Sequence, residues 1–323
     1  LMLVFSASLM FVGCGKNDNK IRLNEVTHSI FYAPLYVALN MGFFEEEGLE
    51  VTLESTSGSD SSMTTLISGS ADIILAGPEQ VVYAEEVKDR PMVFGQLTQK
   101  DGSFIVGRED TDNFSLNDLK GKTIIGGRQG GLPAMTLQYV IETSGLKIGT
   151  NAGQGEVNLR TDVAFANIGS EFITSGNEYC TLFEPTATLL EKAGNGFVLK
   201  AVGDLSGYIP YTCFIAKESY LRDKSEQSEK FLKAVYKGYK YISTESAEKS
   251  AKALKNSFAG MTQEELEIAV TQYLAIDAWC SSPVMSEASF DKLLAVLNNA
   301  SKDNYNPSYS KLVNTSIAQK IGK

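Results

Sequence analysis

Short apolar segments alternate with helical segments along the first third of the sequence, and this alternation restricts the fold more than any other feature. The apolar segments have the length and residue alternation of β-strands, and each is followed by a turn of small or aromatic residues. The predicted strands are 21–27, 51–54, 71–75, 93–97 and 104–106, and the predicted helices are 33–41, 61–68 and 79–87. Because strands that alternate with helices form parallel β-α-β units, we expect an α/β fold.

The stretch His28–Val51 (HSIFYAPLYVALNMGFFEEEGLEV) combines a helix start, a helix stop and a turn. Pro34 suits the first helical position, because the N–H that it lacks has no helical partner there. Gly42 suits the left-handed residue after a helix. A helix N-terminus favours ligand binding through its free N–H groups, and three side chains precede this one: Ser29, Phe31 and Tyr32. Both aromatic rings fit an ordinary hydrophobic core equally well.

The segment YAPLYVALNMGFFEEEGLEV resembles the opening signature of solute-binding proteins of ABC importers. In the thiamine-precursor-, sulfonate- and nitrate-binding group of these proteins, an aromatic–x–Pro–x–aromatic helix is followed by Gly-Phe-Phe and Glu-Gly-Leu. The resemblance covers roughly residues 21–300. It implies the type II periplasmic-binding-protein fold, in which two lobes, each a mostly parallel sheet flanked by helices, enclose a ligand cleft and are joined by two hinge crossings.

The length of 323 residues suits two domains better than one. The polar segment 111–122, whose DLKGK turn opens the second lobe in the family, and the segment LSGYIP at 205–210 mark the expected crossings. We therefore expect lobe 1 at 21–110 and 212–323 and lobe 2 at 111–211. Further predicted strands are 123–126, 157–161, 178–182 and 211–216, and further predicted helices are 134–143, 163–168, 186–192, 225–244, 247–258, 262–277 and 286–299.

Ligands of open α/β sheets bind beyond the carboxyl ends of the strands, so the loops there supply the candidate site. The small-residue loop with Gly58, Ser59 and Asp60 offers backbone N–H groups to a ligand, or is simply a capped helix start with Ser59 or Asp60 as N-cap. Glu79 follows Gly77-Pro78 at another helix start. The Gly-rich loop with Gln129 and Gly130 permits close approach of backbone and ligand, or is a tight turn.

The segment Phe183-Glu184-Pro185 puts a carboxylate at a strand end, and related binding proteins carry an aromatic–Glu–Pro there that faces the cleft. A ligand amino group beside a protonated ring nitrogen matches the two oxygens of a carboxylate. Glu184 has an equal alternative, which is to accept hydrogen bonds from the backbone of its own helix. Tyr211, at the return to lobe 1, adds another aromatic ring.

The aromatic residues and carboxylates together favour a planar nitrogen heterocycle as ligand, with a thiamine-type aminopyrimidine precursor as the first choice. An aliphatic sulfonate such as taurine is the alternative, and it requires Arg and backbone N–H donors. Arg128 is the one basic residue beside a candidate loop. A flavin-sized heterocycle is a third option.

Catalysis has little support in the sequence. His28 is the only His, and a single His near a strand end is more often structural than a general base. The fungal thiamine-pyrimidine synthases have the same fold, but they carry a cysteine-rich CCCFC stretch where this chain has Tyr211-Thr212-Cys213-Phe214. We therefore predict no enzymatic activity, no catalytic residue, no cofactor and no metal site.

The first residues have the features of an export signal. Residues 1–13 are mostly apolar and end in a small residue before Cys14, which resembles the lipobox of bacterial lipoproteins. We expect a signal peptide at 1–13, lipidation of Cys14 and a tether at 14–20; a buried apolar helix is the alternative. The other cysteines, Cys180, Cys213 and Cys280, show no CxxC spacing; we expect mostly buried free thiols, and one disulfide is the alternative that the sequence leaves open.

A net charge of −10 makes nucleic acid an unsuitable partner. We expect a monomer that is held to the outer face of a bacterial cell membrane by its lipid. It captures a small molecule by hinge closure and delivers it to the transmembrane subunits of an ABC permease.

Overall fold

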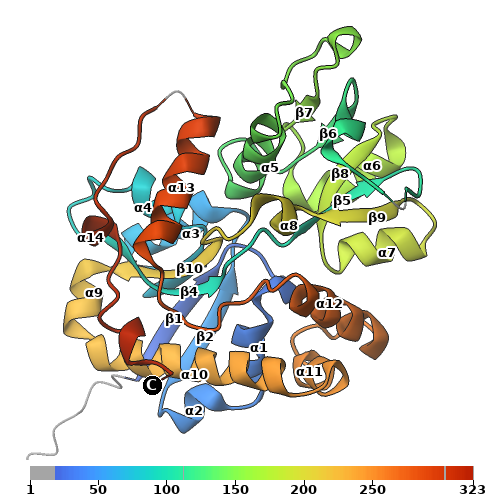
Figure 1. Ribbon diagram of the computed structural model, residues 1–323. Helices are drawn as coiled ribbons and strands as arrows, with labels where there is room; N and C mark the ends of the chain where they lie inside the picture. Colours follow the sequence, from blue (N-terminus) through green and yellow to red (C-terminus); the bar gives the residue numbers. More distant parts are fainter. Residues whose placement is uncertain (1–18, 112, 302, 323) are drawn as a thin grey trace, which may run out of the picture.

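The computed structural model describes residues 19–111, 113–301 and 303–322, and it contains two five-stranded sheets, each flanked by helices (Figure 1). The predicted signal peptide, Cys14 and most of the tether lie outside the described residues. The first sheet has the order β2 (Glu50–Ser55), β1 (Lys20–Glu25), β3 (Ile73–Ala76), β10 (Thr212–Lys217) and β4 (Pro91–Thr98). The second has the order β7 (Asn158–Arg160), β6 (Thr123–Ile125), β8 (Tyr179–Phe183), β5 (Ser103–Gly107) and β9 (Phe197–Ala201).

Both sheets are mixed, but in each of them four of the five strands run in the same direction, which agrees with the mostly parallel sheets that the sequence led us to expect. In the first sheet β1 is parallel to β2 and β3, but β10 is antiparallel to β3 and β4. In the second sheet β6 is parallel to β7 and β8, but β5 is antiparallel to β8 and β9. Strands β5 and β10 are the ones that follow a crossing between the lobes. Because they begin at the edge where the parallel strands end, they run in the opposite direction.

The first crossing lies earlier than expected. Strand β5 (Ser103–Gly107) belongs to the second sheet, so the chain changes lobe just after Thr98 and not near residue 110. The alternation of strands and helices gives no information about which sheet a strand joins. The second crossing, between β9 and β10, agrees with the expected position. The crossings are paired by backbone hydrogen bonds from Ile209 N to Gln99 O (2.9 Å) and from Tyr211 N to Thr98 O (3.1 Å).

Lobe 1, built on the first sheet, is covered mainly by helices from the end of the chain. They are α9 (Glu218–Asp223), α10 (Ser225–Thr244), α11 (Ala247–Leu254), α12 (Gln263–Ala275), α13 (Glu287–Ala300) and α14 (Tyr309–Leu312), beside the earlier α1 (Ala33–Asn40), α2 (Phe43–Glu46), α3 (Ser59–Ser68) and α4 (Glu79–Tyr83). Helix α10 packs closely on α1, because a Cβ at Gly238 would lie 2.0 Å from the carbonyl oxygen of Pro34. The absence of a side chain at Gly238 therefore permits this contact.

Lobe 2 carries α5 (Leu132–Thr143), α6 (Ile168–Thr174), α7 (Thr186–Lys192) and α8 (Val202–Ser206). The lobes touch, since α13 packs against α5 and α12 against α7 (Figure 1). Polar contacts also cross the interface, from Lys192 Nζ to Glu264 Oε1 (3.0 Å) and from Lys292 Nζ to the Tyr139 hydroxyl (3.0 Å). One hydrophobic cluster contains residues of both lobes. The two lobes therefore pack directly against each other.

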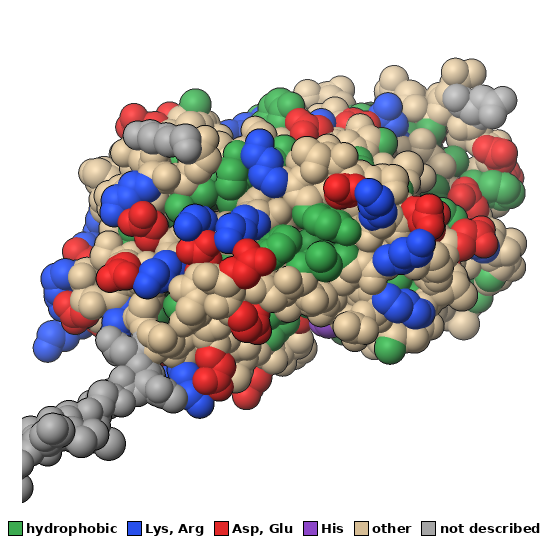
Figure 2. All heavy atoms as spheres, turned by 90° about the horizontal axis from the view of Figure 1, so that it is seen from below, with side chains coloured by type: hydrophobic (Ala, Val, Ile, Leu, Met, Phe, Trp, Pro, Cys, Tyr) green, Lys and Arg blue, Asp and Glu red, His purple; other side chains and the backbone are tan. Residues whose placement is uncertain are grey.

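The surface is charged but of mixed sign. On the face shown in Figure 2, basic and acidic side chains lie close together, with apolar side chains between them. Within the described residues, no helix combines the length and the apolar character that a membrane span needs. Cys180, Cys213 and Cys280 are buried and free, as predicted.

Candidate ligand site

The four aromatic side chains predicted for the site meet where the lobes touch. The Phe31 ring lies 5.4 Å from Phe183, 5.7 Å from Tyr211 and 5.8 Å from Tyr32, centroid to centroid. Tyr273 of α12, which the sequence did not indicate, lies 5.2 Å from Phe31. Since Phe183 comes from lobe 2 and Phe31 from lobe 1, the cluster spans the interface. Most of its rings are buried, so they belong to the core and to the candidate site together.

Local hydrogen bonds fix the position of Phe31. The Ser29 hydroxyl accepts a bond from Phe31 N (3.2 Å) and starts the 3-10 turn Ile30–Tyr32 before α1. The Trp279 indole donates to the Phe31 carbonyl (2.9 Å). The ring lies against Gly102 of the first crossing, where a Cβ would approach it to 2.4 Å. Phe31 therefore packs directly against the hinge.

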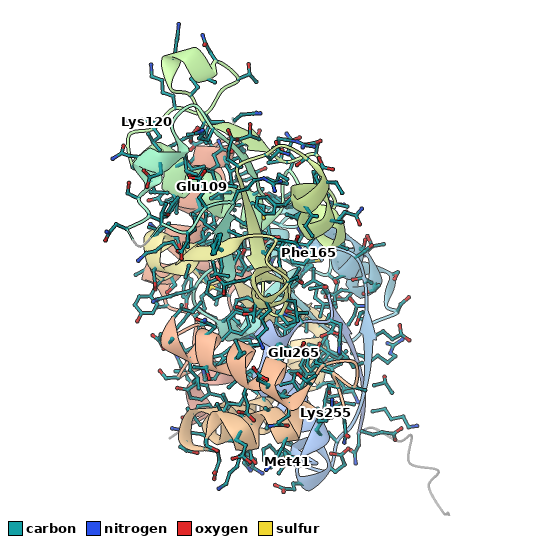
Figure 3. All side chains as sticks on the ribbon, turned by 90° about the vertical axis from the view of Figure 1, so that its right-hand side faces the viewer. Met41, Glu109, Lys120, Phe165, Lys255 and Glu265 are labelled. Atoms are coloured by element: carbon teal, nitrogen blue, oxygen red, sulfur yellow. The ribbon has the colours of Figure 1, made fainter. Side chains whose placement is uncertain are left out.

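A cavity of about 450 Å³ lies beside this cluster and is formed by both lobes. Lobe 1 contributes His28 and Ser29, and lobe 2 contributes Phe183, Glu184 and apolar residues of α6 and α7. Phe165, a further wall residue, is half exposed and lies at the edge of lobe 2 in Figure 3. Phe183 thus faces the cavity and also contacts the buried aromatic cluster.

Glu184 follows the structural alternative that the sequence left open. Its carboxylate accepts from the backbone N of Thr188 (3.2 Å) and from the Thr188 hydroxyl (2.9 Å), both in its own helix α7. Its backbone N donates across the interface to the Tyr273 hydroxyl (3.0 Å). Burial raises the pKa of Glu184 above its ordinary value. The side chain lines the cavity, but both of its oxygens already accept hydrogen bonds.

Glu79 is the candidate carboxylate with an oxygen left unpaired. It is fully buried at the start of α4, and it folds back over Gly77, where a Cβ would lie 2.0 Å from Oε2. Oε1 accepts a long bond from Gln80 (3.3 Å), whereas Oε2 has no hydrogen-bond partner among the described residues. Burial raises the pKa of Glu79 to about 7, against the weaker opposing effect of the hydrogen bond from Gln80.

Asp101 is a buried carboxylate that we did not predict as a site residue. It lies on the first crossing, and its Oδ1 accepts from Ser103 N (2.7 Å) and from the Ser103 hydroxyl (2.6 Å). Its Oδ2 and the hydroxyl of Tyr211 have no hydrogen-bond partner within the described part of the chain. Burial raises the pKa of Asp101 to about 6, although the hydrogen bonds from Ser103 and, more weakly, the nearby Tyr211 hydroxyl act to lower it. The sequence did contain one signal for Asp101, because it is a carboxylate in the short connection between two predicted strands.

The small-residue loops form the rim of the interface. Ser59 Oγ accepts a bond from Gly77 N (3.3 Å), so the loops before α3 and α4 converge as expected. Helix α3 begins at Ser59 after Gly58, and no side chain caps it, so the predicted N-cap role of Ser59 or Asp60 was wrong. Instead, Asp60 pairs with Arg128 of lobe 2 at 2.8 Å. Gln129 and Gly130, the residues after Arg128, are exposed, whereas most rings of the aromatic cluster are buried.

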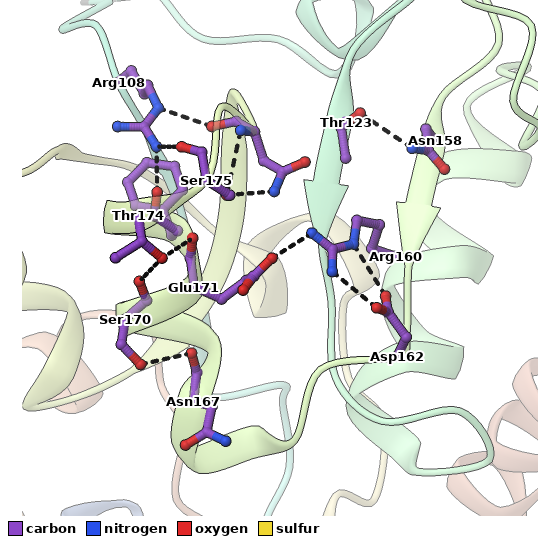
Figure 4. Close-up of polar contacts among 12 residues, drawn as sticks. Arg108, Thr123, Asn158, Arg160, Asp162, Asn167, Ser170, Glu171, Thr174 and Ser175 are labelled. Carbon is purple, nitrogen blue, oxygen red and sulfur yellow. Dashed lines mark hydrogen bonds and ion pairs between the residues drawn. The ribbon is translucent and has the colours of Figure 1, made fainter.

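Every Arg guanidinium in the described residues already has a partner. Arg160, beside an open hollow of about 560 Å³, pairs with Asp162 (2.8 Å) and Glu171 (2.6 Å), as Figure 4 shows. Arg108 donates to backbone carbonyls around the end of α6 (Figure 4). The remaining ion pairs are Arg22–Asp72, Arg90–Glu218, Arg128–Asp60 and Arg222–Asp223. An anionic ligand would have to displace one of these partners.

His28 has a structural position, in agreement with the interpretation of the sequence. Its Nδ1 lies 3.1 Å from Glu25 Oε1, and its Nε2 lies 2.8 Å from the carbonyl oxygen of Ser257. Glu25 is buried and also accepts from Tyr36 and from Ser55. The hydrogen bond with Glu25 raises the pKa of His28. His28 thus joins the end of β1 to the segment after α11. No group of three or more potential metal ligands occurs within the described residues.

Comparisons with known proteins give the family and the fold. The NMT1/THI5-like family matches residues 30–248. The Bacillus subtilis (strain 168) protein "Putative binding protein YtlA" is 39% identical over 324 residues, which cover 98% of this chain and 96% of that protein.

Two solved structures superpose along nearly their whole length. The zinc-bound ligand binding component of an ABC-type import system from Staphylococcus aureus gives a TM-score of 0.73 at 13% identity, covering 94% of this chain and 99% of that one. The alkanesulfonate-binding protein SsuA from Xanthomonas axonopodis pv. citri, bound to MOPS, gives 0.71 at 16% identity, covering 92% and 99%. At these identities the structures show the fold and leave the ligand open. The chain belongs to the NMT1/THI5-like family and has the two-lobed fold of ABC-importer solute-binding proteins.

Proposed function

We propose that the protein is an extracytoplasmic solute-binding lipoprotein of an ABC importer, and that it captures a small planar nitrogen heterocycle between its lobes. A thiamine-type aminopyrimidine precursor is the ligand that we favour. The observation that carries this choice is the position of Glu79, a fully buried carboxylate with an unpaired Oε2, next to an aromatic cluster shared by the lobes.

Aromatic rings and buried carboxylates recognise complementary parts of such a ligand. Phe31, Tyr32, Phe183 and Tyr211 stack on the faces or edges of a planar ring. A buried oxygen without a hydrogen bond is costly, so a ligand N–H that reaches Glu79 removes a penalty as well as adding a contact. Glu184 remains part of the proposed site because it lines the cavity. Since Thr188 already donates to both of its oxygens, we expect its share of ligand binding to be smaller.

A sulfonate, the alternative ligand, fits this environment less well. A sulfonate oxygen needs donors, and the Arg nearest to the candidate loops, Arg128, already pairs with Asp60. Glu79 and Asp101 are buried carboxylates, and an anion beside them is repelled in a medium of low dielectric. The Gly58–Asp60 loop and the Gln129–Gly130 loop are then rim elements that meet when the lobes close. A flavin remains the third option.

The proposed mechanism is hinge closure about the two crossings, with the ligand stabilising the closed lobes by contacts to both. The closed protein then delivers its ligand to the transmembrane subunits of a permease.

We further propose that the protein acts as a monomer and is held at the outer face of the membrane through an acylated Cys14, with residues 1–13 as signal peptide. Mass spectrometry of the N-terminal peptide from a membrane fraction tests the acylation, and an unmodified Cys14 there would contradict it.

Thermal-shift screening of pyrimidines, flavins and sulfonates tests the ligand class, together with mass spectrometry of what co-purifies. We expect the largest stabilisation from a thiamine-type aminopyrimidine, and its loss in Glu79→Gln. Glu86→Gln is the matched control, because the Glu86 side chain is 87% exposed near the end of the same segment. Stabilisation by taurine alone would refute the choice. Conversion of the pyrimidine into a new product would favour the pyrimidine-synthase-like alternative.

A further inference from the structure

Each hinge crossing carries one buried, unpaired polar group at the point where the two lobes are joined. Asp101 lies on the first crossing, and its Oδ2 is buried without a hydrogen-bond partner among the described residues. Tyr211 lies at the end of the second crossing, and its hydroxyl is likewise buried and unpaired there. Burial raises the pKa of Tyr211 most strongly, and the nearby Asp101 raises it further.

The surroundings of this pair are those of a ligand site. The Phe31 ring lies 5.7 Å from Tyr211 and packs against Gly102, the residue after Asp101. Glu79, with its own unpaired Oε2, also influences the titration of Tyr211. Ser103 donates twice to Oδ1 of Asp101, whereas the Oδ2 atom has no such donor and lies close to the Tyr211 hydroxyl.

We propose that Asp101 and Tyr211 form a hinge subsite that binds the exocyclic amino group and the adjacent ring nitrogen of a nitrogen heterocycle. Asp101 Oδ2 accepts from the exocyclic amino group, and the Tyr211 hydroxyl donates to the adjacent ring nitrogen. Glu79 is left to accept a second donor of the ligand. This inference rests on the proposed function and goes beyond it, because it assigns the recognition of a neighbouring donor and acceptor to two residues of the hinge.

The pairing determines which ligands are selected. A carboxylate accepts only, whereas a tyrosine hydroxyl donates as well as accepts, so the pair matches an N–H beside a bare ring nitrogen. A ring with a methyl group in place of the amine leaves Asp101 Oδ2 buried and unpaired. A sulfonate places its negative charge against the same carboxylate. The subsite therefore favours aminopyrimidine-like ligands over both.

The position on the hinge also links recognition to closure. Asp101 and Tyr211 belong to different crossings, which two backbone hydrogen bonds hold together. A ligand that bonds to both side chains adds contacts that depend on the mutual position of the crossings. Such contacts form in the closed state and shift the open–closed equilibrium towards it.

Titration calorimetry of the full-length protein at pH 7.5 tests the subsite with two probes, 4-amino-2-methylpyrimidine and 2,4-dimethylpyrimidine. We expect Asp101→Asn to weaken binding of the aminopyrimidine at least tenfold and Tyr211→Phe about fivefold, as for lost charge-assisted and neutral hydrogen bonds. The dimethyl probe should bind the wild type more weakly and lose little further affinity in either variant. A merely structural role would weaken both probes equally.

Asp204→Asn and Tyr208→Phe are matched controls, because both side chains are partly exposed near the second crossing and pair with Lys100 and Asp277. They should leave both affinities within twofold. If the wild type binds the aminopyrimidine and the Asp101 and Tyr211 variants bind it equally well, the subsite is refuted while the proposed function stands. If the wild type binds taurine or flavin mononucleotide and no pyrimidine, the proposed ligand class fails first, and the subsite with it.

Discussion

Ionisation of Glu79 should destabilise the ligand-free protein as the pH rises. Burial raises the pKa of this side chain from 4.5 to about 7, so the folded state keeps its proton to a higher pH than the unfolded state does. Between these two values the unfolded state binds fewer protons, and the free energy of unfolding therefore falls with increasing pH. A difference of about 2.5 pKa units corresponds to a loss of about 3 kcal/mol, fully developed near pH 8.

Urea unfolding of the wild type and Glu79→Gln at pH 5.0 and pH 8.0 measures this effect. The wild type should lose about 2.5 kcal/mol more than the variant between these pH values, because part of the effect is already present at pH 5.0 and Gln carries no titrating proton at the same position. Asp101 and His28 also have raised pKa values and add losses of the same sign, but they do so in both proteins and cancel in the difference. The neutral Gln80 and Ser59 face Glu79 and do not titrate in this range.

Equal pH slopes in the wild type and Glu79→Gln would refute the reasoning, because they would mean that Glu79 is ionised at pH 5 or solvated in the folded protein. Glu86→Gln, at an exposed position, should keep the full wild-type slope. A saturating amino-heterocycle should flatten the slope of the wild type, because its N–H pairs with the carboxylate and lowers the pKa again.

Three further substitutions test the packing and the polar contacts by denaturant unfolding. Gly238→Ala should cost on the order of 3 kcal/mol, because its Cβ would collide with the α1 backbone, whereas Gly260→Ala, with open space at its Cβ, should be nearly neutral. Tyr36→Phe should cost roughly 1–3 kcal/mol, since the buried Glu25 loses a donor, and a smaller change would mean that water replaces it. Arg128→Ala should cost less than about 1 kcal/mol, and a larger loss would contradict a solvent-screened ion pair.

Local sequence signals predicted most helices and strands of this fold. The apolar stripe of α10 gave a helix over Ser225–Thr244, and the residues after Pro185 gave Thr186–Lys192; both agree with the structure. Short elements without a clear stripe or alternation were missed, such as α2, α8, α9 and β9. The sheet to which β5 belongs was also assigned wrongly, because pairing is decided by partners distant in sequence, which here are β8 and β9.

The parts of the candidate site that could be predicted are side chains of suitable chemistry that also lie at the end of a predicted strand. Phe31, Tyr32 and Phe183 were found because they flank helix starts at the ends of strands, and the structure brings their rings together. Asp101 was not found, because a short polar connection between two strands looks like any surface turn until both crossings are seen side by side. The hydrogen bonds of Glu184 to its own helix were likewise undecidable from sequence, since a carboxylate before Pro suits either role.

The cross-lobe contacts explain why ligand chemistry should control closure. The exposed pairs Asp60–Arg128 and Lys192–Glu264 are screened by solvent, and each contributes less than about 1 kcal/mol. The buried bond between Glu184 N and Tyr273 and the Phe31–Phe183 contact favour contact between the lobes more strongly, whereas Glu79 and Asp101 each keep one buried oxygen without a partner among the described residues. A ligand that supplies the missing N–H donors removes the unfavourable contribution, so it can shift the equilibrium without needing any contact beyond the buried interface.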